Sequence, residues 1–136
     1  MSFLLDTNVV SETRRKAPAP KVVAWVSQAD PSDLFISAMT LGEIAKGVAL
    51  RAKQSPAQAA GLEQWLAETR TEYANRIVAI DADIAEAWGR LDVKRSLPVV
   101  DGLLAATALV RGMTLVTRNV RDVAGAGITL LNPWNA

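Results

Sequence analysis

Short, continuous runs of apolar residues recur along this chain, separated by longer stretches with apolar residues three or four positions apart. Continuous runs are typical of strands that are covered on both faces, and the wider spacing is typical of amphipathic helices. We predict five strands, at residues 3–5, 34–36, 77–80, 114–117 and 128–131. Helices are predicted over residues 21–28 and 101–111, and from Ser37 or Thr40 to about residue 53. Three more are predicted to begin near Asn8, at residues 55–56 and at residues 81–83.

Strands that alternate with helices in this way predict an α/β domain whose parallel sheet is covered on both faces. Gly112 is a suitable end for the apolar helix over 101–111, and residues 118–127 are expected to form a loop or a one-turn helix. With 136 residues, half of them apolar, the chain is expected to form a single domain that spans residues 1–136.

The chain contains no histidine and no cysteine. Their absence excludes Ser-His-Asp and Cys-His catalysis, disulfides, and metal sites built on imidazole or thiolate ligands. The 14 acidic and 15 basic residues give a net charge of +1, which neither requires nor excludes a nucleic-acid partner.

The first ten residues lack a basic leader and carry Asp6, so they are a poor secretory signal. The longest apolar stretch, residues 103–110, is far shorter than the ~20 residues that a transmembrane helix requires. We therefore expect a cytoplasmic protein with no membrane association.

Polar residues gather where the predicted strands end, which is where open α/β sheets bind ligands. Asp6 directly follows the first strand, Glu43 lies in the helix after the second, and Asp101 opens the helix before the fourth. The residues after the fourth strand include Thr117, Asn119 and Asp122. Four carboxylates from separate segments are thus expected to converge at one edge of the sheet.

Each carboxylate also has an ordinary structural explanation. Asp6 and Asp101 suit helix caps, and Glu43 and Asp122 suit solvent-exposed positions. As a group they require neutralisation, because two carboxylates ~5 Å apart repel by about 3 kcal/mol at an effective dielectric constant of 20. Oxygen ligands without histidine or cysteine favour Mg²⁺, with Mn²⁺ as an alternative, and such a site is suited to metal-assisted phosphodiester hydrolysis.

Five segments in order along the chain resemble one protein family. They are residues 4–12 (LLDTNVVSE), 36–44 (ISAMTLGEI), 100–108 (VDGLLAATA), 115–122 (LVTRNVRD) and 131–134 (LNPW). Together they resemble the PIN-domain ribonucleases, specifically the VapC and FitB-like toxins of type II toxin–antitoxin pairs. The chain differs at Val123, where the family often has an aromatic residue, and in the Gly-rich stretch 124–127.

The resemblance implies a PIN-like three-layer α/β/α fold with a small twisted parallel sheet of four to five strands. It also implies a Mg²⁺-dependent endoribonuclease that hydrolyses RNA phosphodiester bonds. The implied catalytic and metal-binding residues are Asp6, Glu43, Asp101 and Asp122. Asn8, Thr117 and Asn119 match residues that hydrogen-bond the acids or bound water. The implied partners are a VapB-like antitoxin, an RNA substrate such as tRNA or rRNA, and a second copy in a homodimer.

Three other functions compete with this interpretation. The acids also fit a metal-dependent phosphatase or DNA nuclease, because the metal contacts only phosphate. A PIN-fold protein that acts through its antitoxin in DNA regulation, with little nuclease activity, is another alternative, although all four acids are present. A receiver-type phosphoacceptor domain would have two adjacent acids after the first strand and a lysine near the last strands, and the chain has neither.

Other residues have a structural and a functional interpretation. The four tryptophans suit a core or an interface better than base stacking, and helix capping suits Asp81 and Asp83. The basic run over residues 14–16 suits phosphate contacts and solvent exposure equally, and Glu12 is assigned no catalytic role.

Overall fold

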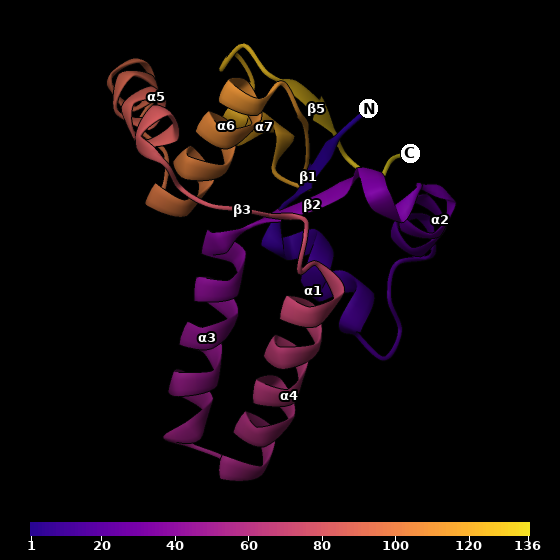
Figure 1. The fold of residues 1–136 in the computed structure, drawn as a ribbon. Coiled ribbons are helices and arrows are strands. Elements are labelled where there is room, and N and C mark those ends of the chain that lie inside the picture. The colour runs from indigo at the N-terminus through magenta and orange to yellow at the C-terminus, as the bar shows by residue number, and fades with distance from the viewer.

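A sheet of five parallel strands forms the centre of the computed structural model, which describes residues 1–136 (Figure 1). The strands are β1 (Phe3–Leu5), β2 (Leu34–Ser37), β3 (Ile77–Val78), β4 (Thr114–Val116) and β5 (Thr129–Leu131). Their order across the sheet is β3-β2-β1-β4-β5. The first strand of the chain therefore lies in the middle of the sheet, hydrogen-bonded to β2 on one side and to β4 on the other.

Helices connect the strands and cover both faces, which confirms the predicted α/β/α class. They are α1 (Thr7–Arg14), α2 (Pro20–Gln28), α3 (Ala38–Ala52), α4 (Pro56–Glu72), α5 (Ala82–Lys94), α6 (Val99–Arg111) and α7 (Val120–Val123), with a short 3₁₀ helix at Pro31–Asp33. None of these helices is both long and apolar enough to span a membrane.

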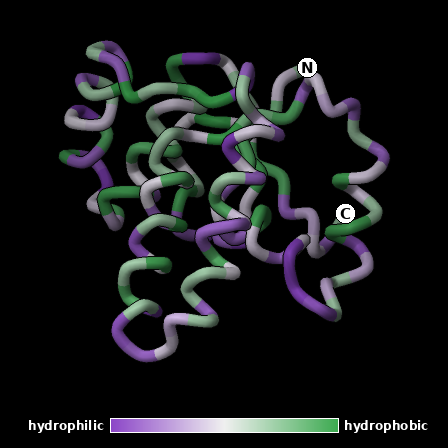
Figure 2. The backbone as a smooth tube through the Cα atoms, turned by 60° about the horizontal axis from the view of Figure 1, so that its bottom comes forward, coloured by the Kyte–Doolittle hydropathy of each residue, from purple (hydrophilic) through white to green (hydrophobic).

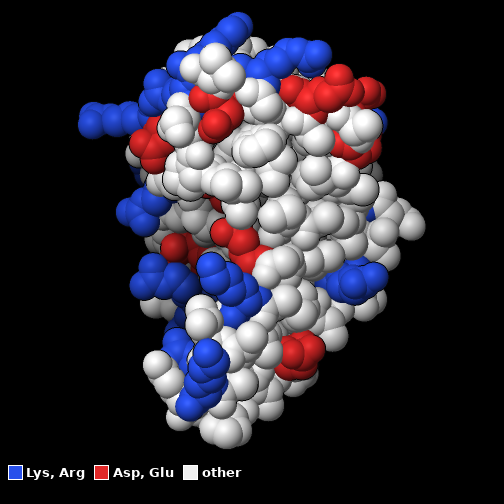
Figure 3. All heavy atoms as spheres, turned by 90° about the vertical axis from the view of Figure 1, so that its left-hand side faces the viewer, with Lys and Arg blue, Asp and Glu red and all other residues white.

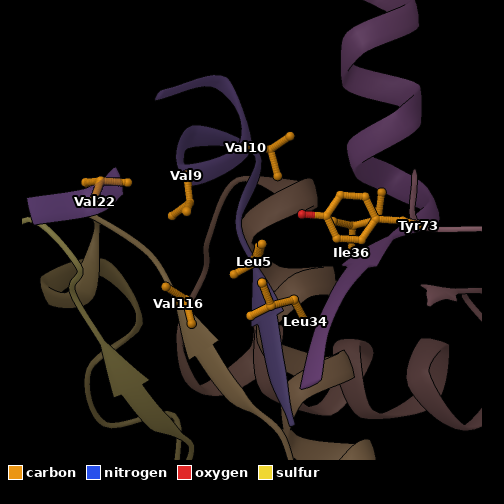
Figure 4. Packing of buried hydrophobic residues seen from close by; sticks show 8 residues of the cluster. All are labelled: Leu5, Val9, Val10, Val22, Leu34, Ile36, Tyr73 and Val116. Carbon is orange, nitrogen blue, oxygen red and sulfur yellow. The ribbon is translucent and has the colours of Figure 1, made fainter. Parts of the chain in front are cut away.

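The two faces of the sheet carry separate apolar clusters, because successive strand residues point to opposite faces. Leu5 and Val116 pack with residues of α1, α2 and the end of α4, and the side chains labelled in Figure 4 point toward one another across this layer. Leu4 and Leu115 face the other way and pack against α5 and α6. In Figure 2 the apolar colour is accordingly strong in the strands at the centre.

The α3–α4 pair extends away from the sheet as a long hairpin (Figure 1). Ser37 caps α3, since its hydroxyl accepts from the Met39 amide at 3.0 Å, and Ser55 caps α4, which has Pro56 at its first position. Only Thr40 and Ile44 of α3 are buried, and both lie near the sheet. Glu43 is therefore at the base of the hairpin, beside the sheet edge.

Two predicted boundaries differ from the structure by two residues, whereas the others agree to within about one residue. The third strand was expected to reach residue 80 but ends at Val78, because β2, its one partner, ends at Ser37 to begin α3. The sixth helix begins at Val99 rather than at Asp101, since Pro98 occupies the N-cap position. Asp101 therefore lies in the first turn of α6 and makes no capping hydrogen bond.

The four tryptophans are all partly buried and pack against other parts of the fold. Trp25, Trp65 and Trp134 lie against the first apolar cluster, and Trp88 of α5 lies against Gly102 of α6. A Cβ atom at position 102 would lie 2.9 Å from Trp88 Nε1 and 3.0 Å from its Cδ1, so only glycine allows the two helices to approach this closely.

Substituting Gly102 and Gly89 by alanine tests this contact. Both glycines lie within helices, so both gain the same helix propensity from alanine, but position 89 has open space around it. Gly89→Ala should raise the free energy of unfolding by about 1 kcal/mol. Gly102→Ala should be less stable than Gly89→Ala by about 1–3 kcal/mol, because it forces α5 and α6 apart. Urea unfolding followed by tryptophan fluorescence measures both, and equal stabilities would contradict the close packing.

Candidate metal centre

Three acidic residues from distant parts of the chain line one recess at the carboxyl edge of the sheet. Asp6 directly follows β1, Asp101 lies in the first turn of α6, and Asp122 lies in α7 after β4. Thr117 and Asn119 line the same recess. Parallel strands end at the same edge, so residues 6, 101 and 122 meet there in spite of their separation in sequence.

Glu43 joins these three residues from the base of the α3–α4 hairpin. Its side chain is exposed, yet it is close enough to raise the pKa of Asp101 through its charge, as do Asp6 and Asp122. The structure therefore brings together all four carboxylates that the sequence indicated. On the face shown in Figure 3, acidic atoms occupy the middle of the surface, with basic side chains beside and below them.

Burial and mutual repulsion disfavour the charged forms of two of these acids. Burial raises the pKa of Asp6, and a hydrogen bond from Thr117 and the nearby amides of Asn8 and Thr7 partly oppose that rise. Burial also raises the pKa of Asp101, and the charges of the other three acids raise it further. Both effects indicate a site with excess negative charge that a bound cation would relieve.

Threonine hydroxyls hold two of the four carboxylates. The Thr117 hydroxyl donates to Asp6 Oδ2 at 2.7 Å, and its oxygen accepts from the Asn119 amide at 3.1 Å. The Thr7 hydroxyl donates to Glu43 Oε1 at 2.6 Å and lies 2.9 Å from the Thr40 hydroxyl. The side chains of Asp101 and Asp122 make no hydrogen bond, so no such bond fixes their orientation.

Arg95 holds the segment that carries the fourth acid. It follows α5, and its guanidinium donates from Nε to the carbonyl of Asp122 at 2.5 Å and from Nη2 to that of Arg121 at 2.9 Å. These carbonyls belong to α7, which has four residues. Arg95 thus attaches a very short helix to α5 without using the Asp122 carboxylate.

The other polar residues that the sequence singled out lie partly at the recess and partly elsewhere in the fold. Asn119 borders the recess, whereas the Asn8 side-chain oxygen is buried without a hydrogen-bond partner. Glu12 is buried and accepts from the Ala19 amide at 2.8 Å, so it closes the loop between α1 and α2. Asp81 caps α5 by accepting from the Ile84 amide at 3.0 Å, as predicted.

Sequence reasoning missed Thr7, Thr40 and Arg95. Thr7 lies between Asp6 and Asn8, and Thr40 is three positions before Glu43, which is one helical turn. These spacings were a signal that both hydroxyls lie close to the acids. No local pattern indicates the contact between Arg95 and α7, which joins residues 27 positions apart.

The donor set fits a hard divalent cation. All four candidate ligands are carboxylates, and Mg²⁺ and Mn²⁺ prefer such oxygen ligands. The buried, unpartnered oxygen of Asn8 is a further oxygen acceptor on the turn that follows Asp6. No group of three carboxylates stands close enough to hold one ion as the side chains are placed. Binding of one ion by three of them would therefore require some of these side chains to rotate.

Known proteins resemble this chain over nearly its whole length. The toxin FitB of Neisseria gonorrhoeae is 32% identical over 140 residues, covering 98% of this chain and 99% of FitB. The crystal structure of FitAcB from that organism superposes with a TM-score of 0.88 at 31% identity, covering 98% of this chain and 99% of that one.

Two further proteins also match this chain over nearly its whole length. The VapC ribonuclease Y4jK of Sinorhizobium fredii is 32% identical over 143 residues, which is 97% of each chain. A toxin–antitoxin complex from Klebsiella pneumoniae contains a chain with a TM-score of 0.73 at 28% identity, covering 97% of this chain and 98% of that one.

A family-level match agrees with these individual ones. The sequence model described as the PIN domain matches residues 3–124, a range that includes all four carboxylates and both threonines that hold them. The order of the strands and the whole-length identity of at least 31% to FitB and FitAcB agree with that match. The chain therefore belongs to the PIN-domain family.

Proposed function

We propose that this protein is a Mg²⁺-dependent endoribonuclease and the toxin of a type II toxin–antitoxin pair. The observation that carries the proposal is the convergence of Asp6, Glu43, Asp101 and Asp122 at one edge of the sheet. A related chain that matches over 97% of each chain is named a VapC ribonuclease, which supports RNA as the substrate.

The four carboxylates would hold Mg²⁺, with Mn²⁺ as a substitute, and Asn8, Thr117 and Asn119 would orient the acids or bound water. When bound, the cation would activate water for in-line attack and stabilise negative charge on the scissile phosphate. Thr117 keeps Asp6 in one orientation through its 2.7 Å hydrogen bond. Without a cation, the four acids would repel a phosphodiester, so substrate binding would depend on their neutralisation.

The proposed partners are a VapB-like antitoxin, an RNA such as tRNA or rRNA, and a second copy of the chain. The toxin–antitoxin complex from Klebsiella pneumoniae supports the first of these. A basic side chain from the antitoxin would be attracted to the acidic recess by charge complementarity.

RNA cleavage is the direct test of the activity. The purified chain, free of any antitoxin, should cut total RNA into discrete fragments in Mg²⁺ and leave it intact in EDTA. Asp6→Asn should lower the cleavage rate by more than about 100-fold, because it removes a central charge from the site. Gel electrophoresis of the RNA measures both effects.

Asp83→Asn is the matched control, because Asp83 is an exposed acid in the first turn of α5. It should cleave RNA at the wild-type rate. Single-stranded and duplex DNA in the same buffer separate a ribonuclease from a DNA nuclease. Cleavage by a folded Asp6→Asn variant at the wild-type rate would contradict the proposed site.

Asp101→Asn tests the electrostatics of the site without metal. Because the pKa of Asp101 is raised in the folded state, the folded chain binds this proton more tightly than the unfolded chain does. The stability that this proton contributes is present below the unfolded pKa and is lost as pH rises from the unfolded pKa through the higher folded pKa. In EDTA, Asp101→Asn should therefore match the wild type near or below pH ~3.9, the unperturbed aspartate value, and be more stable above it. Urea unfolding between pH 3.5 and 7.5 measures this difference.

Added Mg²⁺ should reverse the order at neutral pH. The wild type should gain stability with Mg²⁺ by ligand linkage, whereas Asp101→Asn should gain much less. In the EDTA experiment, a difference in stability between Asp101→Asn and the wild type that did not grow with pH would show that Asp101 experiences no excess negative charge.

A further inference from the structure

Glu43 differs from the other three acids in how it is held. Its side chain is exposed and lies on the α3–α4 hairpin, whereas Asp6 is buried at the end of the central strand. An exposed glutamate has three rotatable bonds and samples many rotamers, so without restraint it would occupy the recess only part of the time. One side-chain hydrogen bond restrains it, the 2.6 Å contact from the Thr7 hydroxyl to Oε1.

The direction of this hydrogen bond follows from proton counting. A carboxylate can only accept, so Thr7 must donate its single hydroxyl proton to Glu43. The 2.9 Å contact between Thr7 and Thr40 then requires that Thr40 donates to the Thr7 oxygen. The three side chains form a hydrogen-bonded series, in which Thr40 donates to Thr7 and Thr7 donates to Glu43.

Thr40 is the rigid end of this hydrogen-bonded series. It is fully buried in the first turn of α3, and Glu43 follows one turn later on the same helix. Thr7 is the first residue of α1, directly after Asp6. The hydrogen bonds therefore join the segment that carries Asp6 to the helix that carries Glu43, across 33 and 36 positions of sequence.

We propose that Thr7 is a positioning residue that holds the Glu43 carboxylate at the acidic recess, with Thr40 directing the Thr7 hydroxyl. This inference rests on the proposed function, because it assigns Thr7 a role in metal binding at the same site. Thr117 holds Asp6 by the same arrangement, since its hydroxyl donates to the acid and accepts from another group. Two of the four acids are thus set in place before a cation arrives, and two are left to close around it.

The test compares Mg²⁺ affinity among variants that change one hydroxyl. Thr7→Val keeps the shape of the side chain and removes the donor, and Thr7→Ser keeps the donor. Thr7→Val should raise the Mg²⁺ concentration for half-maximal thermal stabilisation by about tenfold, and Thr7→Ser should stay within about twofold of wild type. Thr40→Val should change it in the same direction by a smaller factor, because Thr40 acts through Thr7.

Thr13→Val is the matched control on the same helix. The Thr13 hydroxyl donates to the Val10 carbonyl at 2.8 Å and makes no contact with the acids. This variant should bind Mg²⁺ as wild type does. Urea unfolding in EDTA shows for every variant that it is folded, so a loss of affinity is not confused with a loss of structure.

A double substitution distinguishes positioning from a general structural role. If Thr7 acts through Glu43, Thr7→Val should have no further effect on Mg²⁺ affinity once Glu43→Ala is present. Cleavage by Thr7→Val should also recover at high Mg²⁺, while Glu43→Ala should recover less. Equal losses from Thr7→Val in both backgrounds would overturn the inference, as would a wild-type affinity in Thr7→Val.

The two proposals fail in different ways. If wild type binds Mg²⁺ and cuts RNA but Thr7→Val does both equally well, only the role of Thr7 is wrong. If the folded wild type binds no divalent cation, the proposed function fails and the positioning role fails with it.

Discussion

Strand β1 is hydrogen-bonded to β2 on one side and to β4 on the other, so its carboxyl end is flanked by strand ends on both sides. Asp6 follows immediately and is buried there, and its backbone amide donates to the Val116 carbonyl of β4. The rest of the site is arranged around this fixed acid. Helix α6 brings Asp101, the turn after β4 brings Thr117, α7 brings Asp122, and α3 brings Glu43. If β1 were at the edge of the sheet, its final residue would be solvated and the acids would have no common centre.

The four acids that concentrate negative charge at this edge are held in two different ways. Asp6 and Glu43 accept hydrogen bonds from threonine hydroxyls, which fix the orientation of both carboxylates. Asp101 lies in the first turn of α6, where the helix dipole favours an anion, and Asp122 is exposed to water. Arg95 binds the backbone of α7 rather than its carboxylate, so it anchors the segment without neutralising the acid. The negative charge of the recess therefore remains available to a cation.

The sequence predicts the layers and the meeting of the four acids at one edge of the sheet, because both depend on local patterns. Continuous apolar runs such as residues 34–36 mark strands, and an acid just after such a run falls at the sheet edge. Boundaries that depend on a partner strand were less accurate, as the early end of β3 at Val78 shows. The hydroxyl chain from Thr40 through Thr7 to Glu43 was not predicted, because it joins side chains more than 30 positions apart. The contact of Arg95 with α7 is of the same kind.

The hydrogen bond between Thr117 and Asp6 spans 111 positions of the chain, and this separation has a consequence for the order of events during synthesis. At ~5–20 residues per second, a ribosome completes Thr117 roughly 6–22 s after Asp6. Through that interval strand β1 has no partner on its β4 side, because β4 has not yet been made. The acidic recess is thus among the last parts of the molecule to assemble, and a nascent or truncated chain that lacks the segment after Arg111 has no such recess.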